Sequence, residues 1–585
     1  MLNAEVAKIF RQLAIYEDME NEFFRARAYQ RGAEALEALA EDVKEIYRRG
    51  WLKALEEIPG IGGSLAEKIE EYLKTRRVHT QEQFKKKLPL NLEELYAVEG
   101  LGPKTIKLLW EQLKIKNLKD LERAARLGKI ATVPHLGEKT QEKILRAITF
   151  VRQTGDRKLL GAVLPLARAL EERFRRLPGV TEAVVAGSLR RRQETIGDID
   201  LLVVTTKPKL AHETFIKMPE VIAVKAHGAG RSEVRLSLGM DADLRVVPPE
   251  SFGAALQYFT GDKQHNVELR KIAIAKGLKL NEYGLFREKK LIASRTEAEV
   301  YRALGLDLIP PEVRTAAGEL AAAKNHALPR LLPYGSVRGD LQIQTKWTDG
   351  VSSLEEMARA ALALGREYIA ITDHTRTLAM TGGLDERGLA RQAKEIDALN
   401  TKVVQGKFGD KNKKFRVLKG AEVNILKDGS LDIDDAALAK LDIVAAAVHT
   451  NMKMPRPEMT RRIIKALQHP RLHILFHPTG RLINKRPPYE VDIREVIKAA
   501  KKYRVALEVN AFPDRLDLKD EHVRLAVAAG VKLVINTDAH APEHLRYLEF
   551  GEATARRGWA TRGDVLNTLP LNKLLEVFRK KTIIG

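Results

Sequence analysis

The stretch Gly187-Ser188-Leu189-Arg190-Arg191, followed by Gly197-Asp198-Ile199-Asp200, decides how this chain is interpreted. Its two carboxylates stand at positions i and i+2, and such side chains project from the same face of a strand. The glycine and serine upstream leave the backbone free to approach a phosphate. Carboxylates placed in this way hold divalent cations against a nucleoside triphosphate. The segment therefore makes the chain a candidate polymerase.

A second pair of carboxylates lies downstream, in Asp241-Ala242-Asp243-Leu244-Arg245. Nucleotidyl transfer uses two metal ions about 3.5–4 Å apart, and a third carboxylate from a neighbouring strand would complete their ligands. The alternative is that each aspartate only caps a turn or pairs with an arginine. A repeated Asp-x-Asp after Gly-Ser favours metal ligands over that alternative.

Glycine turns recur in the first 150 residues, which are predicted to be mostly helical. Residues 58–66, 98–106 and 133–140 each place a tight turn before an amphipathic helix. They resemble the helix-hairpin-helix motif, in which N–H groups at a helix N-terminus meet a DNA phosphate without contacting bases. The residues expected at the DNA backbone are Gly60, Gly62, Gly100 and Gly102. His135 replaces the first glycine of the third segment, so an ordinary helix turn stays open there.

The composition points to a nucleic-acid partner. The 585 residues carry a formal net charge of +22, which favours a polyanion. There is no cysteine, which excludes disulfide scaffolds, thiolate zinc fingers and a cysteine nucleophile. No apolar run approaches the ~20 residues that cross a bilayer, and the N-terminus does not resemble a signal peptide. We therefore expect a cytoplasmic protein with no membrane partner.

The C-terminal half alternates strands and helices, which suggests a barrel-like parallel sheet. Strands are predicted at residues 368–372, 443–448, 506–510 and 533–537. Histidine and acidic residues follow most of these apolar strands. Ligands at the C-terminal ends of barrel strands converge on one mouth, where the active sites of such folds lie. Histidine and carboxylate together suit Mn²⁺, Zn²⁺ or iron.

The first half resembles the family X DNA polymerases over about 315 residues. The resemblance rests on Gly187-Ser188, Gly197-Asp198-Ile199-Asp200, Tyr258-Phe259-Thr260-Gly261 and Leu280-Asn281-Glu282-Tyr283-Gly284. It implies Asp198, Asp200 and Asp243 as ligands of Mg²⁺ or Mn²⁺, with Asp243 also aiding removal of the primer hydroxyl proton. It further implies residues that contact the nucleotide, its sugar or the nascent pair: Gly187, Ser188, Arg191, Tyr258, Phe259, Gly261, Lys263, Asn266 and Arg270.

Some members of that family also remove a 5′-deoxyribose phosphate through a lysine Schiff base, and Lys68 stands at the matching position. Such a lysine must be neutral to attack. Two supporting lysines of the animal members are absent, because Ser64 and Arg25 stand there. A lysine on an amphipathic helix is usually solvated, so lyase activity is the less favoured expectation.

The second half resembles the polymerase and histidinol phosphatase (PHP) domain, which often follows the polymerase core in bacterial members. Seven positions match its metal ligands: Asp349, His374, Glu422, His449, His477, Asp538 and His540. The family opens with a His-x-His pair, where this chain has Gln342 and Gln344, and amides are poor ligands beside imidazole. An intact domain implies a Mn²⁺-dependent 3′–5′ exonuclease. Here a slower nuclease, a phosphatase with fewer ions (Mn²⁺ or Zn²⁺) and a structural relic stay open.

We therefore expect a multidomain α+β and α/β chain with helix-hairpin-helix domains, a nucleotidyltransferase palm and a distorted β/α barrel. The expected domains are 1–80 (lyase-like), 81–150 (fingers), 151–255 (palm), 256–315 (thumb), 316–335 (linker) and 336–585 (PHP). The expected function is filling of short gaps in DNA repair by a monomer acting on gapped or nicked DNA and dNTPs. A template-independent nucleotidyltransferase and a DNA-end binding protein with an inactive PHP domain are the alternatives.

Overall fold

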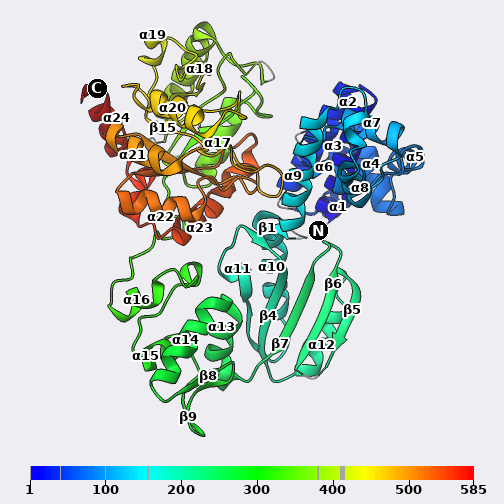
Figure 1. Ribbon diagram of the computed structural model, residues 1–585, viewed down its shortest axis with the longest axis vertical. Helices are drawn as coiled ribbons and strands as arrows, with labels where there is room; N and C mark the ends of the chain where they lie inside the picture. The colour runs from blue at the N-terminus through cyan, green and yellow to red at the C-terminus, as the bar shows by residue number, and fades with distance from the viewer. Residues whose placement is uncertain are drawn as a thin grey trace. The chain divides into compact units, whose positions relative to one another are not determined.

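The chain forms two compact units, seen in a computed structural model (Figure 1). One unit comprises Met1–Gly155 with Leu482–Pro487, and the other comprises Asp156–Arg481 with Pro488–Gly585. The structure describes residues 2–39, 41–58, 60–98, 100–154, 157–228, 230–378, 381–408 and 415–584. Pro59 and Glu99, which belong to the predicted glycine turns, lie outside these residues.

The N-terminal unit is built of amphipathic helices, as its sequence predicts. They are α1 (Leu2–Met19), α2 (Phe23–Ala38), α3 (Val43–Glu56), α4 (Gly63–Thr75), α5 (His79–Lys87), α6 (Leu92–Tyr96), α7 (Pro103–Leu113), α8 (Leu118–Arg126) and α9 (Glu138–Thr154). One apolar core includes Phe10, Leu55 and Ile69, and a second includes Leu109 and Ile144. The two cores place the first glycine turn in one bundle and the other two in the next.

A five-stranded sheet in the order β2-β4-β7-β6-β5 follows along the chain. Its strands are β2 (Val180–Val185), β4 (Asp198–Thr205), β5 (Val221–His227), β6 (Arg231–Leu236) and β7 (Asp241–Val246). Strands β4 and β7 run parallel, and the other neighbours are antiparallel. Ile199, Leu201 and Val203 of β4 are fully buried, so the alternate residues Asp198 and Asp200 face the other side. Helices α10 (Leu160–Arg175) and α12 (Pro208–Ile216) pack against this sheet (Figure 1).

The thumb region is a small α+β layer. It contains α13 (Phe252–Thr260), α14 (Lys263–Ala275), β8 (Lys279–Asn281), β9 (Gly284–Arg287), β10 (Lys290–Ala293), α15 (Glu297–Ala303) and α16 (Glu319–Lys324). The strands form an antiparallel sheet in the order β10-β9-β8. Helix α16 lies in the segment 316–335 that was predicted to be a linker. Its Ala323 belongs to the thumb core, so the first part of this segment is packed rather than extended.

Seven parallel strands form the C-terminal barrel-like sheet, which confirms the predicted fold class. They are β11 (Gly339–Ile343), β12 (Tyr368–Ile371), β13 (Arg416–Asn424), β14 (Ile443–Ala447), β15 (Ile474–Leu475), β16 (Ala506–Asn510) and β17 (Leu533–Asn536). A bridge between Ile343 and Ala539 and the bond from Gln344 N to Ala539 O (2.8 Å) join the first and last strands. This near closure brings the carboxyl ends of all seven strands together at one mouth.

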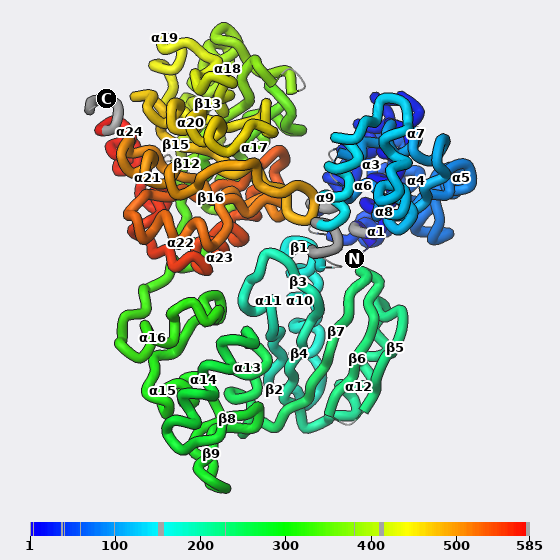
Figure 2. Tube along the Cα trace, in the orientation of Figure 1, coloured from blue at the N-terminus to red at the C-terminus, as the bar shows by residue number. Residues whose placement is uncertain are grey.

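Helices surround the barrel sheet, as the tube in Figure 2 shows from yellow-green to red. They are α17 (Leu354–Ala363), α18 (Glu386–Val404), α19 (Asp435–Leu438), α20 (Arg456–Leu467), α21 (Ile493–Tyr503), α22 (Asp520–Ala529), α23 (Leu548–Arg557) and α24 (Leu571–Ile584). None of the helices in the described residues combines the length and the apolar content of a membrane span.

Candidate functional site

The palm sheet brings the predicted carboxylates together on one face. In the parallel pair β4–β7, Asp198 stands opposite Asp241, and Asp200 stands opposite Asp243. The period of two along each strand then places all four side chains on the same side. Leu202 of this face packs with Leu256 of α13. The face therefore changes from apolar contact with α13 to acidic groups at the start of β4.

Arg191 and Arg245 offset only part of the negative charge around the Asp200 carboxyl. Burial, together with the neighbouring Asp198 and Asp243 carboxylates, raises its pKa to about 7. A carboxyl whose pKa is raised by two neighbouring carboxylates fits a site that takes divalent cations, because the cations supply the missing positive charge. The donor set of carboxylate oxygens suits Mg²⁺ and Mn²⁺.

Gly187 is the residue that allows this packing. It has φ +58° and starts the short helix α11 (Gly187–Arg190), and a Cβ added there would lie 2.2 Å from Asp200 Oδ2. A side chain at this position would therefore displace the carboxylate. Next to it, Ser188 Oγ and Arg191 Nε are buried without a hydrogen-bond partner among the described residues. Buried donors of this kind call for an acceptor, and a phosphate oxygen meets that need.

The other predicted nucleotide-contacting residues lie at the end of α13 and along α14. Arg191 donates to the carbonyl of Thr260, one residue before Gly261, whose φ is +69°. Asn266 Nδ2 donates to the carbonyl of Tyr258 at 2.7 Å, which holds the two helices together. Phe259 makes an edge contact with the Tyr258 ring, and the two ring centroids are 5.1 Å apart. The side chains of Lys263 and Arg270 are exposed.

Cations from neighbouring strands distinguish the two aspartates of β7. Lys225 and Arg235 lie 2.6 and 3.0 Å from the Asp241 carboxylate, and both lower its pKa. Among the described residues, Asp243 pairs with one cation, Arg231 of β6, at 2.6 Å. Arg231 is a functional candidate that sequence reasoning missed, because only the antiparallel β6–β7 pairing brings it near Asp243.

A second missed feature is a buried ionic cluster behind the Gly-Ser segment. Glu297 at the start of α15 accepts hydrogen bonds from Arg190 at 2.9 and 2.6 Å and from Arg314 at 2.6 Å. Arg190 also donates to Thr260 Oγ1 at 2.6 Å. Burial would raise the pKa of Glu297, but the two guanidinium groups lower it to about 2. The cluster joins the palm segment to the thumb.

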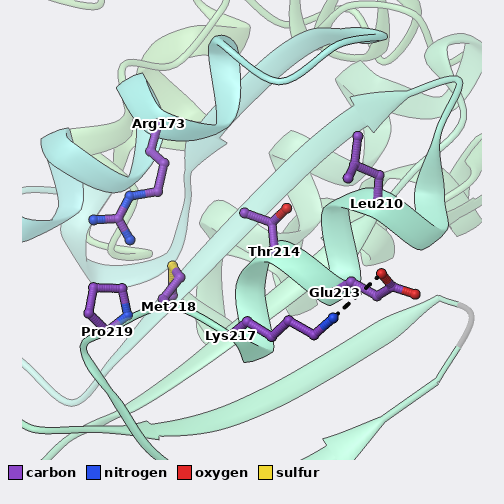
Figure 3. A pocket seen from close by; sticks show the side chains of 7 residues that line it. All are labelled: Arg173, Leu210, Glu213, Thr214, Lys217, Met218 and Pro219. Carbon is purple, nitrogen blue, oxygen red and sulfur yellow. Dashed lines mark ion pairs between the residues drawn. The ribbon is translucent and has the colours of Figure 1, made fainter.

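An open hollow of about 410 Å³ lies on the palm beside α12 (Figure 3). It is lined by Arg173, Leu210, Glu213, Thr214, Lys217, Met218 and Pro219. Its Lys217 ammonium and Glu213 carboxylate are 3.8 Å apart, a surface ion pair of small energetic weight. Asp198, Asp200, Asp241 and Asp243 do not line this hollow, so it is separate from the candidate active site.

The three glycine turns of the N-terminal unit share one geometry. Ile61 N donates to Ile58 O at 2.9 Å, and the equivalent bonds to Val98 and Val133 measure 3.1 and 3.0 Å. The middle residue has φ +90° at Gly60, +89° at Gly100 and +67° at His135. The third turn therefore keeps the left-handed backbone without a glycine. Gly62 and Gly102 cap α4 and α7, and a Cβ at either would meet no atom within 4 Å.

Lys68 lies on α4, after the first glycine turn. Its ammonium donates to Ser64 Oγ at 3.1 Å and lies 5.8 Å from the Tyr29 ring centroid. Arg25 approaches the buried Glu17 at 4.0 Å. Ser64, which replaces a family lysine, therefore serves as a hydrogen-bond partner of Lys68.

Polar side chains from all seven barrel strands meet at the mouth. They stand at or just beyond the strand ends and are Gln342, His374, Glu422, His449, His477, Asn510 and Asp538. Glu422 lies between two imidazoles, with Oε1 2.8 Å from His477 Nε2 and 3.0 Å from His449 Nε2. Burial would raise the pKa of Glu422, but His374, His449 and His477 hold it well below its usual value. Two ring nitrogens directed at one carboxylate oxygen form a first ligand set.

A second ligand set surrounds Asp349. The Nε2 atoms of His374 and His540 both lie 3.6 Å from Asp349 Oδ2. Burial would lower the pKa of His540, but Asp349 and Asp538 raise it to about 10. These three residues offer ligand atoms within 4.8 Å of one another, as do His374, Glu422 and His449. The donors fit Mn²⁺ or Zn²⁺, which take imidazole and carboxylate together.

A shell of hydrogen bonds orients these ligands, and sequence reasoning missed it. Asn424 Oδ1 accepts from His449 Nδ1 at 2.7 Å, which leaves Nε2 for Glu422. Asn424 in turn donates to Asp432 at 2.9 Å. The backbone is also held in unusual conformations, with φ +26° at His477 and +56° at Asp538. Non-glycine residues with such angles concentrate at functional sites, since packing must hold them there.

The position of the family's His-x-His pair is filled differently. Gln342 and Gln344 both donate to Glu422 Oε2, at 3.1 and 2.8 Å. Arg515, which no motif singled out, places Nε 3.2 Å from Asp538 Oδ2. The position between Gln342, Gln344 and Asp538 therefore does not fit a metal ion, whereas the two ligand sets around Glu422 Oε1 and Asp349 do.

Family models match three parts of the chain. A helix-hairpin-helix domain matches residues 1–78, a SAM-like helix-hairpin-helix tandem matches 92–149, and the DNA polymerase beta thumb matches 255–315. The tandem spans both the second and the third glycine turn. The exposed His135 therefore lies in a segment similar to known helix-hairpin-helix repeats.

Relatives cover the whole chain. It is 36% identical over 586 residues to the DNA polymerase/3′-5′ exonuclease PolX of Bacillus subtilis (strain 168), over 99% of this chain and 100% of that one. A probable phosphatase of Thermoanaerobacter sp. (strain X514) is 30% identical over 240 residues, 39% of this chain and 89% of that one. DNA polymerase lambda of Rattus norvegicus is 24% identical over 348 residues, 53% of this chain and 56% of that one.

Proposed function

Because this chain belongs to the bacterial family X DNA polymerases with a C-terminal PHP domain, we propose that it fills short DNA gaps at the palm carboxylates. The observation that carries the proposal is the parallel pairing of Asp200 with Asp243, closely covered by Gly187. Gapped or nicked DNA and dNTPs are the proposed substrates. We propose that the protein acts as a monomer in the cytoplasm.

Each palm residue has a proposed part in the transfer. Asp198, Asp200 and Asp243 would hold Mg²⁺ or Mn²⁺, which when bound neutralise the triphosphate and acidify the primer 3′-hydroxyl. Asp243 accepts the hydroxyl proton. The unpartnered Ser188 hydroxyl and the Arg191 guanidinium bind the triphosphate oxygens.

The end of α13 and the start of α14 position the sugar and the base. Tyr258, Phe259 and Gly261 lie beside the sugar, where the backbone meets a ribose 2′-hydroxyl. Asn266, tied to the Tyr258 carbonyl, faces the minor groove of the nascent pair together with Arg270. The exposed Lys263 adds a cation near the incoming phosphates.

The glycine turns hold the DNA backbone on both sides of the gap. Gly60, Gly62, Gly100 and Gly102 are the proposed phosphate contacts, and a Cβ at Gly62, Gly100 or Gly102 would meet no atom within 4 Å, which leaves the N–H groups of α4 and α7 open to a phosphate. Such contacts contain no base readout, so binding is tolerant of sequence. The net charge of +22 makes this binding salt-dependent.

Primer extension on a one-nucleotide gap tests the proposal. Asp198→Ala should abolish extension while binding of the gapped DNA survives. Extension by this variant would refute the assignment. Addition of all four nucleotides irrespective of the template would instead support the template-independent alternative.

For the PHP domain we propose a metal-dependent 3′–5′ exonuclease that trims primer ends. Glu422 with His449 and His477, and Asp349 with His374 and His540, would hold Mn²⁺ or Zn²⁺. Two ions suffice to activate water and to stabilise the leaving oxygen of a phosphodiester. The inactive-domain alternative predicts no Mn²⁺-dependent shortening of a labelled primer.

A lyase step is proposed only for Lys68, which packs on Ser64 and Tyr29. Borohydride reduces a lysine Schiff base to a stable adduct. A labelled 5′-deoxyribose phosphate end that is trapped by the parent chain and not by Lys68→Ala would assign the step to this residue. Absence of trapping by the parent chain would remove it.

A further inference from the structure

Two buried carboxylates at the barrel mouth are neutralised by protein donors. Glu422 and Asp538 are 0% and 3% exposed, and a buried carboxylate is costly unless it is paired. Glu422 Oε2 accepts from the amides of Gln342 and Gln344. Asp538 Oδ2 accepts from Asn510 Nδ2 at 3.1 Å and faces Arg515 Nε at 3.2 Å. Glu422 Oε2 and Asp538 Oδ2 are thus occupied by N–H groups, whereas Glu422 Oε1 faces His449 and His477.

The orientation of the first amide follows from its neighbours. The backbone N–H of Phe512 donates to Asn510 Oδ1 at 3.0 Å, so the Asn510 NH₂ group must point the other way. That NH₂ group lies 3.2 Å from Gln342 Oε1. Gln342 must therefore present its own NH₂ group to Glu422, and an amide NH₂ cannot ligate a metal.

The Gln344 amide also directs its NH₂ group toward Glu422. Gln344 Nε2 lies 2.8 Å from Glu422 Oε2, and its buried Oε1 has no partner among the described residues. An ionised carboxylate accepts hydrogen bonds only, so the NH₂ group of Gln344 faces it. Both amides therefore act as donors to the carboxylate that a metal ion would otherwise bind.

The positive charge beside Asp538 comes from Arg515, which lies in the loop after β16. Arg515 N donates to Phe512 O at 2.8 Å, a tight turn that returns the chain toward the mouth. Burial would lower the pKa of Arg515, but the carboxylates of Asp538 and Asp514 raise it, so the guanidinium stays charged. A guanidinium is weakly hydrated for a cation, which suits a buried ion pair.

We propose that the Arg515 guanidinium, with the amides of Gln342 and Gln344, permanently replaces one metal ion of the PHP centre. The centre then takes metal only at the Glu422–His449–His477 set and the Asp349–His374–His540 set. The inference rests on the proposed PHP metal centre and adds that one of its positions is closed by a protein cation. It explains how a chain without the His-x-His pair keeps Glu422 and Asp538 buried.

Counting bound Mn²⁺ in the full-length chain tests this. The protein is stripped with EDTA, equilibrated with Mn²⁺, freed of unbound ions and analysed by inductively coupled plasma mass spectrometry. Gln342→His/Gln344→His should bind as many ions as the parent, because Arg515 still fills the position. Adding Arg515→Met should raise the count by one equivalent. Adding Arg515→Lys, which keeps the charge, should leave it unchanged.

Two results would overturn the proposal: a gained ion in the double variant with Arg515 intact, or no gain in the folded Met triple variant. Circular dichroism and gap filling at the separate palm site report whether each variant is folded. Arg515→Gln replaces Met if that variant is unstable, since its amide can still bond Asp538. An Asp349→Ala/His449→Ala variant that binds as many ions as the parent would refute the metal centre itself, while the Arg515 comparison could still be judged.

Discussion

Asp200 of β4 and Asp243 of β7 are direct neighbours in the parallel register of the palm sheet. Two residues earlier on each strand, the register pairs another two aspartates, Asp198 and Asp241. The four side chains share one face, yet their ionic partners differ. In the part of the chain that the structure describes, Asp241 pairs with two cations, whereas Asp243 pairs with one. This difference predicts which aspartate of β7 serves the reaction.

Asp243→Asn should reduce the rate of gap filling by at least about 100-fold, the scale for losing one electrostatic stabiliser of a transition state. Asp241→Asn, two residues away, should change it by no more than about fivefold, since a half-exposed ion pair contributes up to ~1 kcal/mol. Single-turnover extension at saturating nucleotide measures both. Equal losses in the two variants would contradict the assignment.

Gly187→Ala should displace Asp200 and reduce single-turnover extension about 100-fold, as expected when a catalytic group moves by about 1 Å. The reason is the 2.2 Å separation between the added Cβ and Asp200 Oδ2. Gly277→Ala is the matched control, because its φ of +68° is similar and its Cβ would meet no atom within 4 Å. It should lose stability and keep the extension rate. Normal extension by Gly187→Ala would show that Asp200 can move without consequence.

Gly62→Thr/Gly102→Thr should weaken binding of gapped DNA about tenfold, equally for different sequences, because the new side chains stand between helix N–H groups and a phosphate. Threonine caps helices about as well as glycine, and neither new Cβ would meet an atom of the protein within 4 Å. The melting temperature should therefore change little. Gly230→Thr, also in open space, is the control. Fluorescence anisotropy at fixed salt measures affinity, and unchanged affinity would exclude these turns from the interface.

Structural features that depend on the spacing of nearby residues were predictable from the sequence. The Asp-x-Asp spacing determines that Asp198 and Asp200 share a face, because the strand period is two residues. The alternation of strands and helices predicted the barrel-like parallel sheet. The histidine and acidic residues that follow its strands predicted a site at their C-terminal ends. The third turn, for which the sequence leaves an ordinary helix turn open, has the same left-handed backbone at His135 as the first two have at Gly60 and Gly100.

Pairing partners set by tertiary structure could not be predicted in this way. Arg231 reaches Asp243 only through the antiparallel β6–β7 register. Arg515 reaches Asp538 because a loop turns back after β16, and no sequence period encodes that distance. The segment of α16 is predicted to be a linker because prolines flank it, yet Glu319 is buried against His265 at 2.7 Å. Such contacts depend on which segments meet, not on local spacing.

The thumb should lose stability in acid through Glu297. Its pKa is lowered from 4.5 to about 2, so its stabilisation is fully present above pH 4.5 and is lost as pH falls toward 2. Glu297→Gln should destabilise the thumb at pH 7 by about 3–5 kcal/mol, the cost of removing one partner of a buried ionic cluster. The variant should also depend less on pH between 4.5 and 3. Hydrogen exchange of α15 measures this locally, and Glu268→Gln is the control, because Glu268 makes a surface ion pair with Lys271 and accepts from Gln264 on the same helix.

Single substitutions should abolish either gap filling or primer shortening and leave the other activity intact. His449→Ala removes one of the two imidazoles on Glu422 Oε1 and should abolish Mn²⁺-dependent shortening of a labelled primer while gap filling continues. Asp200→Asn should do the reverse. His469→Ala, whose imidazole pairs with the exposed Asp435 outside the mouth, should leave both activities intact. Primer shortening that persists in His449→Ala would show that the nuclease binds its metal through other residues. Shortening absent from the parent chain, with gap filling intact, would mean that the protein cation beside Asp538 has left the PHP domain without hydrolytic chemistry.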